Sequence, residues 1–145
     1  MVREAVYNDL GGLLELYLHL HETRVPEDSD ALRDAWRRIM SDENHHILVD
    51  DEGGLLVASC VCVIIPNLTR GARPYAFVEN VVTRAAYRRQ GRAAACLDRA
   101  REIATRAGCY KMMLMTGSKS AGTLQFYKKC GYNADDKTAF VQWLK

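Results

Sequence analysis

The sequence lacks a long apolar run, a signal-peptide pattern and a large excess of charge of either sign. Its longest apolar stretch, Leu55–Ile65, is far shorter than the roughly 20 residues that a transmembrane helix needs. The opening residues, MVREAVYNDL, contain acidic side chains and no apolar segment of the kind that signals secretion. A net charge of +2 is too small to make the whole surface a nucleic-acid binder. We therefore expect a soluble, cytoplasmic protein with neither a membrane nor a nucleic-acid partner.

Cysteine pairs with metal-binding or redox spacing are also absent. The chain has five cysteines, an odd number, and none forms a CxxC pair. Their surroundings are apolar, which indicates buried free thiols in a reducing compartment. Cys60 and Cys62 share one face of a predicted strand near His45 and His46, but this spacing is not that of a structural zinc site. We expect no metal.

The two best-known nucleotide-binding fingerprints are missing as well. There is no GxxxxGK[ST] run and no GxGxxG run, since Gly91 stands alone. What is present is a basic segment, RAAYRRQGRAAACLDRA, from Arg84 to Ala100. Three readings are open for it: a nucleic-acid surface, a solvated helix, or a turn and helix start that hold a phosphate.

The pattern of apolar residues predicts one α/β domain over residues 1–145. The predicted strands cover residues 2–7, 45–51, 55–66, 74–83, 110–116 and 138–144, the fifth being buried on both faces. The first predicted helix begins near Leu10. The others cover residues 31–40, residues 91–107, where Gly108 ends the helix, and a short segment that ends at Gly131. The order strand, helix, strand after residue 74 is typical of a right-handed crossover. It places the strands 74–83 and 110–116 parallel and adjacent.

The position of the basic segment favours a phosphate-binding turn. It follows the strand that ends ENVVT and precedes a helix, whose first N–H groups lack helical partners and carry partial positive charge. Gly91 permits backbone angles that other residues avoid, and Ala93 lets a ligand approach closely. The later arginines, from residue 99 on, fall on the outer face of the predicted helix. These arginines therefore lie apart from Arg88 and Arg92, and the basic residues do not form one continuous surface that could bind a nucleic acid.

At these residues the sequence resembles the GCN5-related N-acetyltransferase (GNAT) family, whose acetyl-CoA motif is Gln/Arg-x-x-Gly-x-Gly/Ala. Arg88, Gly91 and Ala93 fit this motif. A second match is SAGTLQFYKKCGY, which is similar to the family's N-x-x-A-x-x-FY-x-x-x-GF segment, with Ser120 where the family usually has Asn and Thr123 where it usually has Ala. The resemblance covers almost the whole chain. It implies a mixed, mostly antiparallel sheet of six to seven strands with a splayed parallel pair and about four flanking helices.

The resemblance also implies acetyl-CoA as co-substrate and direct attack by a neutral amine, through a tetrahedral intermediate. The pantetheine arm would pair with the fourth strand, and the pyrophosphate would lie on the N–H groups of residues 89–94. The N–H near Val81 would face the thioester oxygen. The implied cofactor-binding residues are Val81, Val82, Thr83, Arg88, Arg89, Gln90, Gly91, Arg92, Ala93, Ala94, Ser120 and Tyr127.

Two proton transfers need side chains. Tyr127, at the family's tyrosine position, is a candidate to protonate the leaving thiolate, because a phenol is protonated at neutral pH. Glu79, directly or through a water, is a candidate base, and Asn80 beside it points to the opposite face. His19 and His21 are further candidates at the acceptor. The predicted catalytic residues are Tyr127 and Glu79, and the predicted substrate-binding residues are His19, Glu79 and Asn80.

The loops HETRVPED, NLTRGARPY and NADDKTAFVQW are predicted to form the acceptor pocket. They mix acidic residues with Arg24, Arg70 and Arg73, which favours a small amine that also carries an anionic group, such as an amino sugar phosphate or an aminophosphonate. The alternative is a non-catalytic acyl-CoA-binding module that keeps the turn but does not need Tyr127 or Glu79. The resemblance is also compatible with a homodimer.

Overall fold

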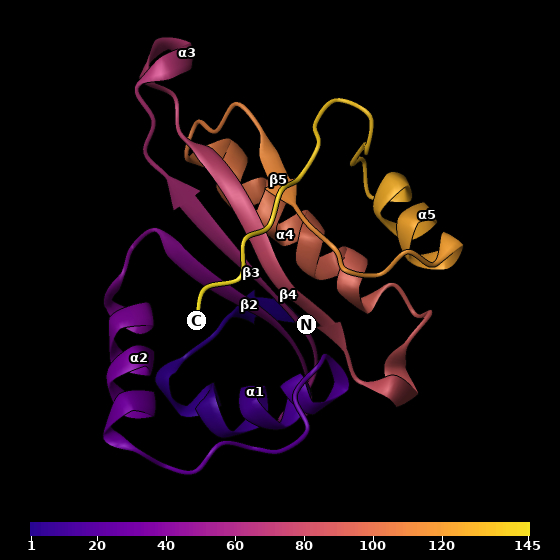
Figure 1. Cartoon of the computed structure of the whole chain (residues 1–145). Helices are drawn as coiled ribbons and strands as arrows, with labels where there is room; N and C mark the ends of the chain where they lie inside the picture. The colour runs from indigo at the N-terminus through magenta and orange to yellow at the C-terminus, as the bar shows by residue number, and fades with distance from the viewer.

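A mixed five-stranded sheet forms the centre of the molecule in the computed structural model, which describes residues 1–145 (Figure 1). Its strands follow the chain order: β1 (Val2–Glu4), β2 (His45–Glu52), β3 (Leu55–Ile65), β4 (Tyr75–Thr83) and β5 (Met112–Leu114). The first four strands pair antiparallel, and β4 pairs parallel with β5. The sheet therefore contains the parallel pair that the sequence predicts.

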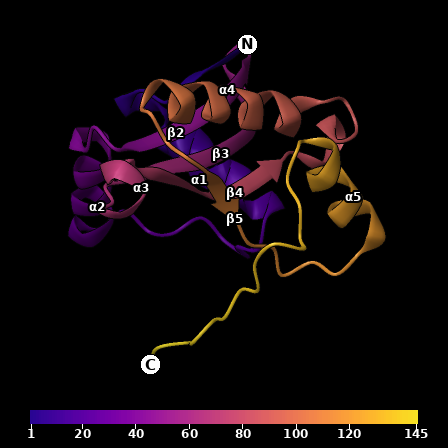
Figure 2. The same cartoon turned by 90° about the horizontal axis from the view of Figure 1, so that it is seen from above.

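The helices cover both faces of this sheet. They are α1 (Leu10–Leu16), α2 (Asp30–Ser41), α3 (Thr69–Ala72), α4 (Arg92–Arg106) and α5 (Ala121–Lys129), with 3-10 turns η1 (Tyr7–Asp9), η2 (Tyr17–His19) and η3 (Ala85–Tyr87). Seen from above, α4 lies along one face and α1 and α2 along the other, while α5 stands beside the end of α4 (Figure 2). None of these helices combines the length and apolarity needed to cross a bilayer.

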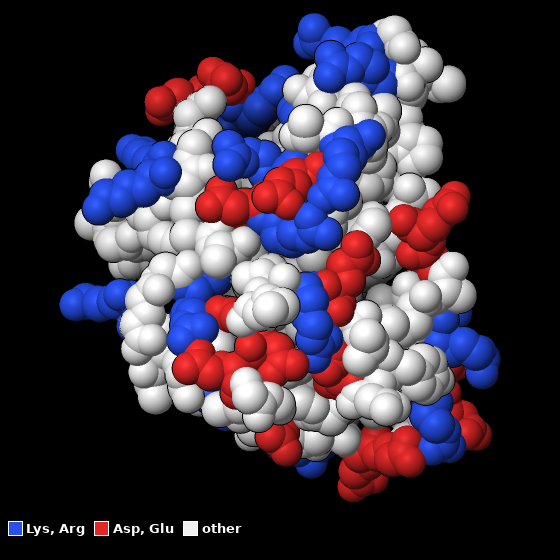
Figure 3. Space-filling view, turned by 180° about the vertical axis from the view of Figure 1, so that it is seen from behind, with Lys and Arg blue, Asp and Glu red and all other residues white.

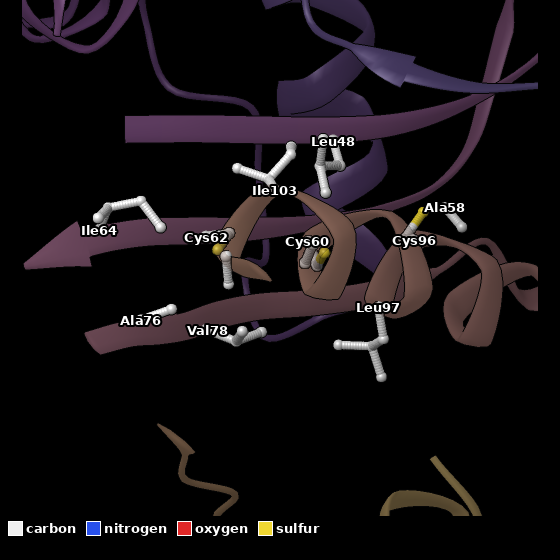
Figure 4. Close-up of a cluster of buried hydrophobic side chains, with 12 residues drawn as sticks. Leu48, Ala58, Cys60, Cys62, Ile64, Ala76, Val78, Cys96, Leu97 and Ile103 are labelled. Carbon is white, nitrogen blue, oxygen red and sulfur yellow. The ribbon is translucent and has the colours of Figure 1, made fainter. Parts of the chain in front are cut away.

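Each face of the sheet has its own core, because alternate strand residues point to opposite sides. On the α4 face, one core cluster contains Cys60 and Cys62 of β3 together with Cys96 and Leu97 of α4 (Figure 4). On the other face, Trp36 of α2 packs with Leu13 and Leu16 of α1 against the sheet. The α4 residues in the core recur at helical spacing: Cys96, Leu97, Ala100, Ile103 and Ala104.

The cysteines support the prediction of free thiols. All five are unpaired, three are fully buried, and Cys109 and Cys130 are half-buried. Burial raises the pKa of the Cys96 thiol to about 12 and that of Cys62 to about 11. These thiols are therefore packing groups that stay protonated at neutral pH.

Two predictions on the C-terminal half were wrong in extent. The predicted strand 110–116 pairs only over Met112–Leu114, and these residues are half-buried rather than buried on both faces. The predicted last strand, 138–144, forms no strand in this chain. The sheet consequently has five strands instead of six or seven. β5 is short because it separates from β4 beyond the pair Val78 and Leu114. Residues 138–144 have the composition of a strand, but pairing needs a neighbouring strand.

The charges on the outer face of α4 form local pairs rather than a basic surface. Arg99 lies 2.7 Å from Glu102, and Arg101 lies 3.1 Å from Asp98, both three residues apart. The view from behind shows blue and red side chains interspersed over this face (Figure 3). The later arginines of the basic segment therefore belong to a solvated, ion-paired helix face.

Candidate active site

An irregularity in β4 marks the centre of the candidate site. Ser59 of β3 pairs with Val82 and Val61 pairs with Glu79, so the single residue Cys60 faces two residues of β4. This is a β-bulge, and its first extra residue, Asn80, has φ 51°. Asparagine tolerates the left-handed region better than most residues. The bulge redirects the backbone of β4 at Asn80 and Val81.

The edge of β4 that faces β5 is free beyond the bulge. The parallel pairing covers only three residue pairs and ends at Val78 with Leu114. From Glu79 to Thr83, β4 has β3 on one side and no strand on the other. Unpaired backbone N–H and C=O groups are strong hydrogen-bonding sites, so this segment can bind an extended ligand that carries amides.

The turn after β4 leads directly to an uncapped helix. Arg89 has φ 62° and Gly91, the residue before α4, has φ 75°. No side chain caps the helix, so the N–H groups of its first turn are not used within the protein by a cap. Ala93 and Ala94 keep this end of the helix narrow. An anion such as a pyrophosphate fits these N–H groups and the positive end of the helix dipole.

The arginines around the turn mostly hold the protein together. Arg88 donates to the Thr83 carbonyl at 3.3 Å and to the His19 carbonyl at 3.1 Å. Arg92 pairs with Asp50 at 3.2 Å and with Glu52, both on β2, and its guanidinium lies 5.7 Å from the centre of the Tyr87 ring. The hydrogen bond to Asp50 and the nearby carboxylates raise the pKa of Arg92.

Among the remaining side chains of the turn, one positive charge has no partner within the protein. Gln90 donates to the Ala86 carbonyl at 3.3 Å. Arg89 is exposed and makes no hydrogen bond or ion pair. Of the three arginines placed at the phosphate by sequence, Arg89 is therefore the one whose charge is not already engaged.

Sequence reasoning missed Asp50, which ties three elements together. Its side chain is only 4% exposed and accepts from the N-terminal amine of Met1 at 2.9 Å as well as from Arg92. A buried carboxylate with two cationic partners fixes the start of α4 against β2. The only signal in the sequence was the acidic end of an apolar strand, HHILVDDE, which carries no information on the partner.

His19 anchors the turn instead of lying free at an acceptor. Its Nδ1 accepts a hydrogen bond from the Ala85 N–H at 3.2 Å, and its carbonyl accepts from Arg88. An accepting Nδ1 places the ring proton on Nε2 when the imidazole is neutral. His21 lies in the following exposed segment, with Glu22 at 3.4 Å.

The second motif forms α5 and places Tyr127 at the body of the protein. Tyr127 is half-buried against the core cluster of the α4 face, with the rings of Phe126 at 5.1 Å and Tyr132 at 6.3 Å. Burial raises the pKa of the Tyr127 phenol, so it stays protonated at neutral pH. Ser120 caps α5: its Oγ accepts from the Thr123 N–H at 3.2 Å and lies 2.9 Å from the Thr123 hydroxyl.

Glu79 and Tyr127 approach β4 from opposite faces. Glu79 pairs in register with Val61, whose side chain belongs to the core under α1 and α2. Tyr127 packs on the α4 side. Glu79 is exposed and has no ion-pair partner. The carboxylate and the phenol therefore lie on opposite faces of the sheet.

The predicted acceptor pocket is not assembled from all three loops. The loop after η2 and the loop around α3 lie at opposite ends of the molecule (Figure 1). Arg73 donates to the carbonyls of Gly108 and Cys109 at 3.1 Å each, and Arg70 stacks over Tyr110 at 5.6 Å. These two arginines contact the segment between α4 and β5, so both side chains already have partners within the protein.

Comparisons with known proteins agree with this architecture. The model of the Acetyltransferase (GNAT) family matches residues 12–132. A putative acetyltransferase from Agrobacterium tumefaciens is 36% identical, with a TM-score of 0.90 over 99% of both chains. An acetyltransferase of Trypanosoma brucei is 30% identical, with a TM-score of 0.79 over 99% of both chains.

A curated relative is similar over most of its length. It is the glucosamine 6-phosphate N-acetyltransferase of Trypanosoma brucei brucei, 32% identical over 130 residues, which are 90% of this chain and 86% of the relative. The match of the family model includes the β4 bulge, the turn before α4 and the helix that carries Tyr127. The family uses acyl-CoA as its donor. This chain belongs to the GNAT family and is one of its N-acetyltransferases.

Proposed function

We propose that this enzyme, as a single domain over residues 1–145, transfers an acetyl group from acetyl-CoA to the primary amine of a small molecule. The observation that carries the proposal is the continuity of two binding features. The free edge of β4 from Glu79 to Thr83 runs into the turn at Arg89–Gly91 and the uncapped start of α4. An extended ligand that carries amides and ends in a pyrophosphate matches this order of a free strand edge followed by a helix start.

The backbone does most of the binding in this proposal. The segment Val81–Thr83 pairs with the pantetheine amides, and the N–H groups of residues 89–94 hold the pyrophosphate, with Arg89 as the free cation. The bulge turns the Val81 N–H toward the carbonyl of the thioester, where it stabilises developing negative charge. Ser120 contributes through the shape of the α5 start, because its hydroxyl is engaged as a cap.

Two side chains handle protons. Glu79, exposed and unpaired on the α1 and α2 face, accepts the proton of the attacking amine directly or through a water. Tyr127, kept neutral by its raised pKa, donates to the leaving thiolate from the α4 face. Asn80 fixes the backbone of the bulge, and His19 fixes the backbone of the turn that follows β4. The acetyl donor supplies a thioester carbonyl, so no covalent enzyme nucleophile is needed.

An amino sugar phosphate is the acceptor class that we propose. The support is the curated relative, which is named for glucosamine 6-phosphate and matches 90% of this chain.

The test is release of free thiol from acetyl-CoA with a panel of acceptors. We expect the highest kcat/KM with glucosamine 6-phosphate or a close analogue. We expect a loss of at least about tenfold, or 1.4 kcal/mol, when the phosphate is removed. The N-acetylated sugar phosphate, which has no free amine, is the control and should release no thiol. Activity with peptides or polyamines but not with amino sugars would overturn the acceptor class. Binding of acetyl-CoA without thiol release for any acceptor would favour the non-catalytic module.

A further inference from the structure

The turn between β3 and β4 has an unfavourable backbone and lies at one end of the molecule (Figure 1). Three consecutive residues of α3, Arg70, Gly71 and Ala72, have φ of 56°, 69° and 59°, in the left-handed region that residues with a Cβ avoid. Asn67 Nδ2 donates to the Arg73 carbonyl at 3.2 Å and so closes the turn. Strained backbone of this kind is found mostly where it positions groups for a function.

The turn places cations over two tyrosine rings. The Arg70 guanidinium lies 5.6 Å from the centre of the Tyr110 ring. Lys111 Nζ lies 5.2 Å from the centre of that ring and 5.2 Å from the centre of the Tyr75 ring. Arg73 donates to two backbone carbonyls just after α4, at 3.1 Å each. We call these five residues the α3 cluster.

The two segments that carry the α3 cluster are fixed to each other. The Tyr110 N–H donates to the Pro74 carbonyl, and the Ala76 N–H donates to the Lys111 carbonyl, both at 3.0 Å. The centres of the Tyr75 and Tyr110 rings lie 6.3 Å apart in an edge-to-face arrangement. The cations above these rings are therefore held in place before a ligand arrives, which lowers the entropy that binding costs.

No carboxylate balances these cations. None of Arg70, Arg73 and Lys111 forms an ion pair, whereas the arginines on the outer face of α4 are each paired with a glutamate or an aspartate. The end of the molecule that carries α3 shows blue side chains with no red ones beside them (Figure 3). The rings and carbonyls orient the cations but leave three positive charges without an anion, so the cluster fits an anionic partner.

An apolar side chain accompanies the α3 cluster. Leu68 lies in the same turn, two residues before Arg70, and is 95% exposed. A single exposed leucine needs no explanation elsewhere on a surface. Beside three unbalanced cations, however, it adds an apolar contact to the charged ones, and a partner that uses both must carry anionic and apolar groups together.

We propose that the α3 cluster and Leu68 bind an acidic segment of a partner protein, with apolar residues between its carboxylates. The cations bind the carboxylates, and Leu68 contacts an apolar side chain between them. Single-stranded nucleic acid fits less well, because its bases stack on ring faces. Here cations already lie over the two rings, which stand at 68° to each other. Binding to a membrane surface uses clusters of about four to eight cations, and this turn has three.

This surface is separate from the candidate active site. The α3 cluster lies where β4 begins and just after the C-terminal end of α4, whereas the candidate site lies toward the end of β4 and at the N-terminal end of α4. A helix of 15 residues is roughly 22 Å long. The partner can therefore bind while the turn before α4 stays open, and the proposal does not rest on the proposed function.

The experiment measures the binding of a fluorescein-labelled peptide by fluorescence anisotropy at low salt. The peptide alternates pairs of glutamates with single leucines. Its amino end is blocked and it has no lysine, so it cannot accept an acetyl group. We expect saturable binding that weakens steeply as the salt concentration rises. A matched peptide with glutamine in place of glutamate should bind at least about tenfold more weakly.

Two variants with the same change in charge locate the surface. Arg70→Gln/Lys111→Gln should bind the acidic peptide about tenfold more weakly than the wild type. The matched control is Lys128→Gln/Lys129→Gln at the exposed end of α5, where neither lysine forms an ion pair. This control should bind within about twofold of the wild type. Leu68→Ser should bind about threefold more weakly, because it loses only an apolar contact.

A measurement on the wild type covers the case in which the first variant fails to fold. Backbone amide chemical shifts of the isotope-labelled full chain are recorded with and without the acidic peptide. They should change at residues 68–75 and 109–111 and stay unchanged in α5. Shifts that change in α5 or along the turn before α4, and not in the α3 cluster, would contradict the proposal.

Other outcomes would also overturn it. The proposal fails if the acidic peptide does not bind at low salt, or if the two double variants weaken binding equally, which would show a response to overall charge alone. Tighter binding of a single-stranded oligonucleotide or of phosphatidylserine vesicles would assign the surface to another class of partner. The same amide shifts on raising the protein concentration without peptide would show that a second copy occupies it. These assays use neither acetyl-CoA nor an acceptor, so a failure of the proposed function leaves their outcome unaffected.

Discussion

The charge of Arg92, beside the turn before α4, is already paired with other residues of the protein. Its guanidinium is shared by Asp50 and Glu52 of β2 and lies against the Tyr87 ring. A side chain held by two carboxylates adds little net positive charge to the turn before α4. Its contribution is positional, since it fixes the start of α4 against the sheet.

Asp50→Asn tests that positional role. The amide is nearly isosteric but loses the charge that holds Arg92 and the N-terminal amine. We expect acetyl-CoA to bind about tenfold more weakly while kcat at saturation changes less than about twofold. Isothermal titration and steady-state kinetics separate the two quantities. Asp98→Asn, which removes an exposed carboxylate paired with Arg101 on the same helix, is the control. A fall in kcat without a change in affinity would contradict the positional role.

Tyr127→Phe tests the proposed proton donor. The variant keeps the ring that packs against Phe126 and removes only the hydroxyl. General acids contribute typically about 10²-fold or more, so we expect kcat to fall by about 10²-fold with acetyl-CoA affinity within about twofold. Tyr132→Phe removes the hydroxyl of the neighbouring tyrosine, 6.3 Å away between ring centres, and should leave turnover unchanged. Full turnover in Tyr127→Phe would take this residue out of the mechanism.

At the scale of elements, the turn before α4 depends on one backbone conformation. Gly91 has φ 75°, and a Cβ placed there would meet nothing within 4 Å, so strain alone opposes a side chain. Gly91→Ala should therefore lower the free energy of unfolding by about 1 kcal/mol. Gly11, in α1, also has open space around it but a helical φ. Gly11→Ala should raise the free energy of unfolding by up to about 1 kcal/mol. Urea titrations measure the free energy of unfolding of both variants. A change in the same direction for both would contradict the role of the backbone conformation at Gly91.

The tie between β1, η1 and β2 predicts a pH dependence. Arg3 donates to Asp9 at 2.7 Å and to Asp51 at 2.8 Å, and these bonds lower the pKa of both carboxyl groups. A carboxyl with a lowered pKa in the folded state stabilises the fold above its unfolded pKa, near about 4. That stabilisation is lost as the pH falls through the lower, folded pKa.

Arg3→Met should therefore unfold at lower urea than the wild type near pH 7, and this difference should shrink as the pH falls below about 4. Urea midpoints at neutral and acid pH measure it. Arg101→Met breaks an exposed pair on α4 and should shift the midpoint little at either pH. A difference for Arg3→Met that grows in acid would contradict the direction of the pKa shifts.

The elements differ in how far the sequence determines them. The helix from residue 92 could be predicted because its apolar positions recur at helical spacing and Gly108 follows it. The bulge at Asn80 could not, because it is a shift in register between two strands that are both regular in sequence. The free edge of β4 was reached only through the family resemblance. The contacts of His19 and Asp50 could not be predicted, because their partners lie far away in the chain.

At the scale of the whole molecule, a segment can have the composition of a strand and still form none. Residues 138–144 are rich in β-branched and aromatic side chains, but no strand of this chain pairs with them. The propensity to form a strand depends on one segment, whereas a ladder of hydrogen bonds depends on two paired segments. The same holds for the acceptor pocket. Loop composition suggested a shared pocket, but the fold places two of those loops at opposite ends of the sheet (Figure 1).

Binding of acetyl-CoA should be visible in the stability of the whole molecule. The donor is expected to contact β4, the turn before α4 and the region of α5, so only the folded chain can bind it. A ligand at 100 times its Kd stabilises by about 2.7 kcal/mol, which for a chain of this size raises Tm by roughly 10 °C. Differential scanning fluorimetry with and without acetyl-CoA measures the shift. In Gly91→Ala, strain in the turn should displace the N–H groups of the first helical turn. The rise in Tm should therefore be smaller than for Gly11→Ala at the same acetyl-CoA concentration. An unchanged Tm for the wild type at millimolar acetyl-CoA would refute acetyl-CoA as the donor.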